Sequence, residues 1–278
     1  MDYKLSEIEK RFLSEAKQKC RKLAIGIVDP SPEVVSSLKQ AVDYADLIVV
    51  GCKIDGLNCI ETKNETEASK IIVDLLKSEK VEGVIRGQLK DSETHKLFLQ
   101  AYNRPEDKEK IPVCFLAKDG QWFVTTSCSN YSSLTLETKR SEIWQTIQWL
   151  ESNLGIKPTI AITSTRRPTG RVGEFGLLEE IAERCETVAK ELKEKGYDVK
   201  EYYIEYEKAV WEGRTLICPA IGMIGNTWMK GLTYLGGWRW VGLAYLNQGV
   251  YWNNTPKNNK DWLWPVIFSV AWINRGKL

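Results

Sequence analysis

The sequence predicts an α/β protein built on mostly parallel sheets. Short apolar runs such as "LAIGIV" (23–28) and "TIAIT" (159–163) alternate with longer stretches whose apolar residues recur at helical spacing. The alternation begins near residue 5 and begins again after "NLGIKP" (153–158), a Gly-containing helix stop. Chains that alternate strand and helix in this way form parallel sheets with helices on both faces.

The first half of the chain contains an opening amphipathic helix, because Leu5, Ile8, Phe12 and Ala16 share one helical face. Further strands are expected at 23–28, 46–51, 82–87, "IPVCFLA" and "QWFVTT", and further helices up to about residue 41, at 65–79, from 91 and at about 138–153. The second half repeats the pattern. It has strands at 159–163, "VKEYYIEY", "TLICP" and "WVGLAYL", and helices at 177–195, 226–235 and 261–273.

Composition and charge exclude several classes of protein. Apolar residues make up 43% and charged residues 27% of the chain, which is typical of a globular protein. The formal charge is only +2 and no basic tract is present, so we expect no nucleic-acid partner. The longest apolar stretch, 262–273, is too short to span a bilayer, and the charged N-terminus lacks a signal core. These features predict a cytoplasmic protein without a membrane span.

Metal and disulfide chemistry find little support in the sequence. The seven cysteines form no CxxC pair, so most are expected to be reduced thiols. The only histidine, His95, is expected to be a surface or capping residue early in a helix. We therefore expect no metal site and no required cofactor.

Ligands of parallel sheets bind beyond the carboxyl ends of the strands. That rule selects four loops: "GCKIDG" (51–56), "RGQLKDS" (86–92), "TSTRRPTGR" (163–171) and "PAIGMIGN" (219–226). None of them is a Walker A loop, a GxGxxG fingerprint or a GxSxG elbow. Nucleotide hydrolysis, dinucleotide binding and α/β-hydrolase chemistry therefore lose support.

Three of these loops carry candidate anion-binding residues. Arg86 and Gly87 stand at a strand end just before a helix, where a guanidinium beside free helix N–H groups could hold an anion. An Arg that forms a salt bridge across the sheet end is the alternative. Ser164 and Arg167 lie in a loop with three arginines that suits phosphate or a phosphorylated ligand. A solvated basic loop is the alternative there.

The glycine-rich loop 219–226 is expected to lead into a helix with Asn226 as its N-cap. Gly225 would then let an anion approach the backbone N–H groups closely. Tight turning of the chain is the alternative use of these glycines.

Two segments resemble a known superfamily. "ICPAIGMIGNTWMKGLTYLGG" (217–237) and "LESNLGIKPTIAITS" (150–164) are similar to passages of the phosphate acetyl/butyryltransferases and PlsX-like phosphate acyltransferases. "GVIRGQL" and the loop 163–171 fit the methanogenesis-marker MtxX-type branch, which is historically labelled methyltransferase-related. The resemblance spans residues 80–275, with a vaguer fit before that.

The resemblance implies a two-lobed fold of the isocitrate/isopropylmalate dehydrogenase type with an interlobe cleft. It places lobe one at 1–154 and 248–278, with the last helix returning to it, and lobe two at 155–247. The cleft would be lined by Arg86, Ser164, Arg167, Gly225, Asn226 and Asp261 and would take a phosphate-containing or CoA-like anionic ligand. The family commonly dimerises, so a homodimer is expected.

The chain departs from the family pattern at the positions that carry catalysis. Ala220 stands where the family has an acidic residue, and Asn254, Pro256 and Lys257 stand where it has Asp, Ser and Arg. Asp261 is left as a candidate base and Lys257 as a catalytic cation, although a Lys cannot grip phosphate as a planar guanidinium does.

Two functions therefore stay open: a transferase acting on a phosphorylated or thioester substrate, with a role in C1 or methanogenic metabolism, or a catalytically reduced relative that binds a ligand or partner. Seven of the eleven tryptophans lie in the last 51 residues. They would serve a core, a dimer interface or a stacking surface.

Overall fold

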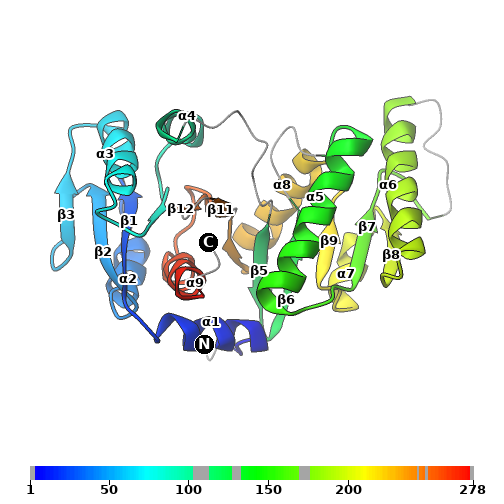
Figure 1. The fold of residues 1–278 in the computed structure, drawn as a ribbon, viewed down its shortest axis with the longest axis horizontal. Coiled ribbons are helices and arrows are strands. Elements are labelled where there is room, and N and C mark those ends of the chain that lie inside the picture. The colour runs from blue at the N-terminus through cyan, green and yellow to red at the C-terminus, as the bar shows by residue number, and fades with distance from the viewer. Residues whose placement is uncertain are drawn as a thin grey trace. The chain divides into compact units, whose positions relative to one another are not determined.

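The computed structural model describes residues 4–102, 113–126, 133–168, 176–242, 244–247 and 250–275. These residues form helices and two six-stranded, mostly parallel sheets (Figure 1). The chain divides into two compact units, one made of Glu7–Lys110 with Trp240–Leu278 and the other of Met1–Ser6 with Ile111–Arg239. The predicted α/β class with mostly parallel sheets is confirmed.

Sheet A, in the first of these units, has the strand order β11-β12-β4-β1-β2-β3. Its strands are β1 (Arg21–Ile27), β2 (Ala45–Gly51), β3 (Asn58–Glu61), β4 (Gly83–Ile85), β11 (Ala244–Asn247) and β12 (Val250–Asn253). All neighbours pair in parallel except β11, which is antiparallel to β12. The carboxyl ends of β1, β2, β3, β4 and β12 therefore meet at one edge.

Helices cover both faces of sheet A. They are α1 (Glu7–Ala16), α2 (Pro32–Ala41), α3 (Glu65–Lys77), α4 (Asp91–Ala101) and α9 (Leu263–Asn274). Ala24 and Val84 pack with residues of α3 and with Phe98 of α4, whose ring lies 4.6 Å from that of Trp252. Gly83 faces Ile273 of α9 instead. α9 also packs against α1 and α2, so the last helix returns to the unit that contains the first one.

Sheet B, in the other unit, has the order β10-β5-β6-β9-β7-β8. Its strands are β5 (Cys114–Lys118), β6 (Gln121–Thr125), β7 (Ile160–Thr163), β8 (Val199–Tyr203), β9 (Leu216–Cys218) and β10 (Arg239–Val241). β5 and β6 form an antiparallel hairpin, while β6, β9, β7 and β8 run parallel. The loops after β6, β9, β7 and β8 consequently leave from one edge.

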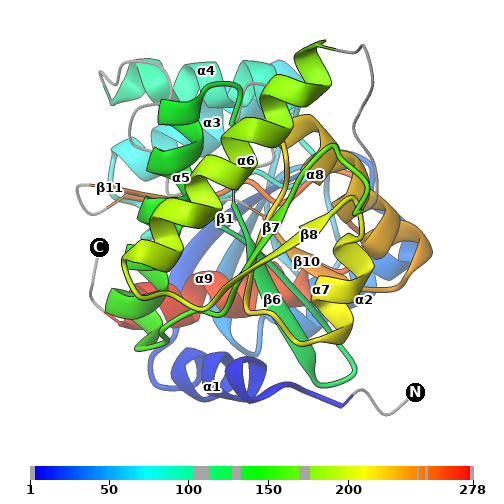
Figure 2. The same ribbon diagram turned by 90° about the vertical axis from the view of Figure 1, so that its right-hand side faces the viewer.

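The helices of this unit are α5 (Leu136–Trp149), α6 (Gly176–Glu194), α7 (Tyr206–Trp211) and α8 (Gly222–Lys230). Single π-helical turns follow α5 at Leu150–Leu154 and α8 at Gly231–Leu235. α5 and α6 lie side by side across one face of sheet B (Figure 2). α8 packs through Trp228, whose ring stacks 6.0 Å from that of Phe123 on β6.

The observed division of the chain differs from the expected boundary at 154/155. β5, β6 and α5 precede that boundary but belong to the unit of sheet B, because β6 pairs with β9. The expected strand "WVGLAYL" is also two strands, β10 in sheet B and β11 in sheet A. Gly242 lies between them, and a Cβ there would come within 2.7 Å of the Cα of Thr255. The interlobe cleft stays a prediction.

Other elements follow the sequence more closely. The predicted helices at 65–79, 177–195 and 261–273 correspond to α3, α6 and α9. The sequence did not predict β3, α7 or β12, which are short or follow polar residues. Within the described ranges, no helix combines the length and the apolar composition needed to cross a membrane.

Gly87 is expected to be indispensable for the packing of sheet A. Its φ is +65°, and a Cβ there would lie 2.0 Å from the carbonyl oxygen of Gly26. We expect Gly87→Ala to lower the free energy of unfolding by about 2–4 kcal/mol, since backbone strain and steric overlap add. Gly56→Ala, in the same unit, is the control, because its φ of +84° is similar but nothing lies within 4 Å. Equal losses in urea unfolding of the two variants would contradict the packing role.

Candidate functional site

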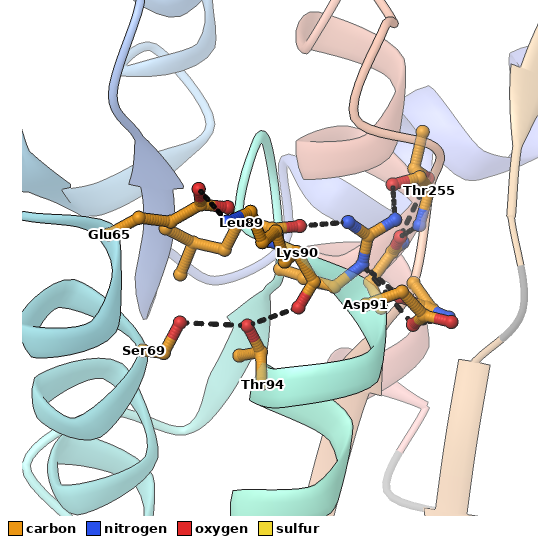
Figure 3. Close-up of polar contacts among 10 residues, drawn as sticks. Glu65, Ser69, Leu89, Lys90, Asp91, Thr94 and Thr255 are labelled. Atoms are coloured by element: carbon orange, nitrogen blue, oxygen red, sulfur yellow. Dashed lines mark hydrogen bonds and ion pairs between the residues drawn. The ribbon is translucent and has the colours of Figure 1, made fainter.

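The carboxyl edge of sheet A is held together by Arg86, which directly follows β4. Its side chain is buried, with the residue only 4% exposed. The guanidinium donates Nε–H to Asn254 Oδ1, Nη1–H to the Leu89 carbonyl and Nη2–H to the Thr255 carbonyl at 3.0 Å. Figure 3 shows Leu89, Asp91 and Thr255, three of the residues that contact this guanidinium. These hydrogen bonds hold Arg86 at the sheet end, and its role in ligand binding stays a prediction.

Asn254 links Arg86 to a nearby carboxylate, that of Asp91. The amide oxygen of Asn254 accepts from Arg86, and its Nδ2 donates to Asp91 Oδ1 at 2.7 Å. Asp91 itself lies 3.6 Å from the Nε of Arg86 and is 59% exposed at its side chain. The hydrogen-bond acceptors described here for the Arg86 guanidinium are therefore carbonyl and amide oxygens, and the Asp91 carboxylate lies further away.

The start of α4, which carries Asp91, is fixed by a second set of contacts (Figure 3). The backbone N–H of Lys90 donates to the carboxylate of Glu65 on α3. Thr94 donates to the Lys90 carbonyl at 2.7 Å and lies 2.9 Å from the hydroxyl of Ser69, also on α3. Both hydroxyl groups are buried. The loop 86–91 is thus a rigid part of the unit.

Gly87 and Gln88 complete this loop. Gly87 packs its backbone against Gly26 of β1, as the short Cβ distance shows. The side-chain amide of Gln88 accepts from the N–H groups of Val28 and Asp29 and donates to the Asp29 carbonyl at 2.8 Å. The loop residues therefore bind the neighbouring loop after β1.

The two residues predicted to be catalytic, Lys257 and Asp261, follow Thr255 in the chain. Lys257 is exposed and follows Thr255 by two residues. Asp261 is exposed as well, and its Oδ1 accepts a hydrogen bond from the N–H of Leu263 at 3.0 Å, which caps the first turn of α9. The structure brings Arg86 to Asn254 and Thr255.

The carboxyl edge of sheet B presents a different arrangement. β7 and β9 are neighbours in register, with Ile162 opposite Cys218, so Ser164 and the loop from Pro219 leave side by side. The Thr163 hydroxyl donates to the Cys218 carbonyl at 3.2 Å. Ser164 is buried, and its hydroxyl accepts from the N–H of Arg166 at 3.3 Å. Two of the loops selected from the sequence therefore adjoin.

The arginines of the loop after β7 differ in their partners. Arg166 donates to Glu179 and Glu186 of α6, which neutralise its charge. Arg167 is exposed, and within the described residues it makes no hydrogen bond or ion pair. Gly170 and Arg171 lie outside the described residues. Of the described loop cations, Arg167 is the one whose charge is available to a ligand.

The start of α8 corrects one prediction. The helix begins at Gly222 with Ile221 as its N-cap, and no side chain caps it. Asn226 is therefore inside the helix rather than at its N-cap, and the N–H of Gly225 already donates to the Ile221 carbonyl at 3.2 Å. Helix geometry leaves the N–H groups of Gly222, Met223 and Ile224 as the unpaired donors of the first turn. The N-cap of α8 therefore lies five residues earlier than expected, at Ile221 instead of Asn226.

Lys139 of α5 supports this loop from within the unit. The residue is 1% exposed, and its Nζ donates to the carbonyls of Pro219 at 2.8 Å and Ala220 at 3.2 Å. No carboxylate of a described residue lies within ion-pair distance of it. Glu142, one turn further along α5, binds the hydroxyl of Ser133 at 2.7 Å. The sequence did not predict a role for Lys139, because an isolated lysine in a charged helix is normally expected to be exposed to solvent.

Two buried thiols lie near the ammonium group. Burial raises the pKa of Cys218 to about 12, although the charge of Lys139 acts in the opposite direction. Burial likewise raises the pKa of Cys185, and Lys139 again opposes the shift. Neither thiol is a nucleophile at neutral pH. Among the described residues, no group of three or more His, Cys, Asp or Glu side chains is placed to hold a metal ion.

Comparison with known proteins agrees with the resemblance seen in the sequence. The chain is 29% identical to a curated protein of Methanosarcina mazei named "Putative methyltransferase mtx subunit X" over 235 residues, which cover 81% of this chain and 80% of that protein. A protein of the same name from Methanosarcina acetivorans is 28% identical over 245 residues, covering 84% and 83%. No protein-family model matches the sequence.

Solved structures extend the comparison to the fold. A branched-chain phosphotransacylase from Enterococcus faecalis superposes with a TM-score of 0.63 at 14% identity, over 90% of this chain and 98% of that one. A phosphotransacetylase from Streptococcus pyogenes gives a TM-score of 0.58 at 13% identity, over 96% and 98%. The predicted resemblance to MtxX-type proteins is confirmed, and the fold is similar to that of the two phosphotransacylases.

Arg86 is expected to act chiefly on stability. We expect Arg86→Lys to lower the free energy of unfolding by about 2–4 kcal/mol, because an ammonium cannot reach all three acceptors at once. Arg11→Lys is the control in the same unit, since its ion pair with Glu15 is partly exposed, and it should cost about 0.5 kcal/mol or less. Urea unfolding measures both. A loss for Arg86→Lys no larger than that for Arg11→Lys would contradict the structural role.

The thiols near Lys139 should resist alkylation. At pH 8 we expect Cys218 to react with iodoacetamide at least about 100-fold more slowly than the exposed Cys20, since it is buried and its thiolate form is scarce. Its rate should rise with pH as the thiol ionises. Peptide mass spectrometry after timed labelling measures each site separately. Comparable rates for the two cysteines would show that the edge of sheet B opens readily.

Proposed function

We propose that this chain binds a small phosphate-containing or CoA-like molecule at the carboxyl edge of sheet B. The observation that carries the proposal is the buried ammonium of Lys139 beneath the loop that opens α8. The helix it supports has no side-chain cap. Its first N–H groups and its dipole favour a negatively charged group.

Charge and position make this edge selective for an anion. Lys139 contributes a full positive charge that no described carboxylate neutralises. Arg167 adds an exposed guanidinium on the neighbouring loop, and the guanidinium fork matches the oxygens of phosphate. The role that the sequence suggested for Ser164 and Arg167 is thereby kept. Anion binding, which the sequence suggested for Gly225 and Asn226, is now proposed for the N–H groups of Gly222 to Ile224.

In this proposal the chemical class of the ligand is inferred from the names of the similar proteins. The structural neighbours are named phosphotransacylase and phosphotransacetylase, and the sequence relatives carry a methyltransferase-subunit name. An acyl phosphate or an acyl-CoA thioester would place its phosphate groups at the start of α8. A transferase role in C1 or methanogenic metabolism is the corresponding proposal for the cell.

A second candidate, ligand binding without the acyl-transfer reaction, is favoured by the edge of sheet A. Arg86 is buried and bonded to Asn254, Leu89 and Thr255, and Asp261 caps α9. The catalytic roles of Asp261 and Lys257 and the ligand roles of Arg86 and Gly87 stay predictions. So do homodimer formation, the cytoplasmic location and the absence of a required cofactor.

Arg167→Ala should weaken the binding of inorganic phosphate by about 5- to 30-fold, the equivalent of about 1–2 kcal/mol for one charged hydrogen bond. Lys157→Ala is the control, because this exposed lysine precedes β7 and so lies at the opposite edge of the sheet. Isothermal titration calorimetry with phosphate, and then with CoA, measures the affinities.

Lys139→Met should weaken phosphate binding further, because it removes the buried charge and leaves the carbonyls of Pro219 and Ala220 without their donor. Far-UV circular dichroism checks the fold of each variant. Phosphate binding that is equally strong in the wild type, Arg167→Ala and Lys139→Met would overturn the proposed site.

A further inference from the structure

A cavity of about 240 Å³ lies at the opposite, amino edge of sheet B. It is far along the strands from the loops described above, because β6 and β9 begin here, at Gln121 and Leu216. Its lining residues come from the β5–β6 turn and the start of β6, from the end of α7 and the segment before β9, and from the residue before β10. All of them belong to one unit.

Aromatic rings form the walls of this cavity. The ring of Trp238 meets that of Phe123 edge to face, with centroids 5.3 Å apart. Trp122 stacks on Phe115 at 6.1 Å, which holds its ring in place. Gly213 has a φ of +69°, and a Cβ there would meet nothing within 4 Å, so open space borders this residue. Flat walls and a glycine border suit a flat ligand.

Arg214 is the one charged side chain that lines the cavity. Its Nε donates to the Tyr202 hydroxyl at 2.8 Å, and its Nη1 lies 2.8 Å from Asp198 Oδ1. Nη1 is buried, and although it lies at ion-pair distance from Asp198, it forms no hydrogen bond with a described residue. The side chain is only 14% exposed, so these donors are fixed in place. A guanidinium has five N–H donors, so a nearly buried one with few acceptors around it can donate a hydrogen bond to a ligand atom.

We propose that this cavity binds a small planar aromatic or heteroaromatic molecule that carries a hydrogen-bond-accepting oxygen at its edge. The volume suffices, because a cavity of roughly 150 Å³ already holds benzene. The ring would lie against Trp122, Phe123 and Trp238, and the oxygen would accept from Arg214. Asp198 already neutralises Arg214, so a neutral carbonyl fits this site as well as a carboxylate does. The proposal is independent of the function proposed for the carboxyl edge.

Benzamide and indole test the proposal, since they have equal numbers of non-hydrogen atoms and only benzamide has an acceptor oxygen. Ligand-observed NMR by saturation transfer should show benzamide binding with a Kd on the order of 1 mM. Arg214→Met should weaken benzamide about fivefold or more. It should change indole binding less than twofold. Lys200→Met is the matched control, because Lys200 bonds Glu212 beside Tyr202 but does not line the cavity.

A second pair of variants keeps the test valid if Arg214→Met fails to fold. Trp238→Leu removes a wall and should weaken both ligands, whereas Trp144→Leu, a partly exposed tryptophan elsewhere in the unit, should weaken neither. Absence of benzamide binding would overturn the proposal, as would equal effects of Trp238→Leu and Trp144→Leu. Benzoate that binds tenfold more tightly than benzamide would overturn the choice of a neutral acceptor.

Discussion

The carboxyl edge of sheet B depends on one buried charge, the ammonium of Lys139. Burying an ion costs several kcal/mol unless polar groups surround it. Here the carbonyls of Pro219 and Ala220 provide that surrounding, so the ion and the loop fix one another. The loop in turn fixes where α8 begins, and the parallel register of β7 with β9 puts Ser164 and Arg167 beside it. Removing the charge would leave two carbonyls and a helix start without their common support.

The two sheets differ in the partners of the buried cation near their carboxyl edges. Both release loops from the carboxyl ends of parallel strands, and both place a buried cation there. In sheet A the guanidinium of Arg86 donates hydrogen bonds to Asn254, Leu89 and Thr255, so groups of the chain itself occupy these donors. In sheet B the ammonium lies behind the loop and leaves the helix start in front of it uncapped. The ligand site is therefore proposed at sheet B.

Similarity to phosphotransacylases at 13–14% identity is compatible with these differences. A shared fold requires apolar strands, amphipathic helices and glycines where backbones meet, such as Gly26 with Gly87. It does not require the loop residues to stay the same, because loops face solvent and carry the chemistry. Asn254 shows the consequence. An amide there makes a neutral link from Arg86 to Asp91, and a carboxylate would form an ion pair.

The sequence by itself determined the α/β class, most helices and strands, and the four loops at the strand ends, because hydrophobic periodicity and the rule for parallel sheets are local and general. It also pointed to Arg86, Ser164 and Arg167. Only the tertiary structure decided that β5 and β6 join β9, and that "WVGLAYL" divides between two sheets, because strand pairing joins residues far apart in the chain. The tertiary structure also decided which cationic side chains have hydrogen-bond partners within the chain. Arg86 meets Asn254 from 168 residues away, and Lys139 meets Pro219 from 80, and such distant partners leave no trace in a local pattern.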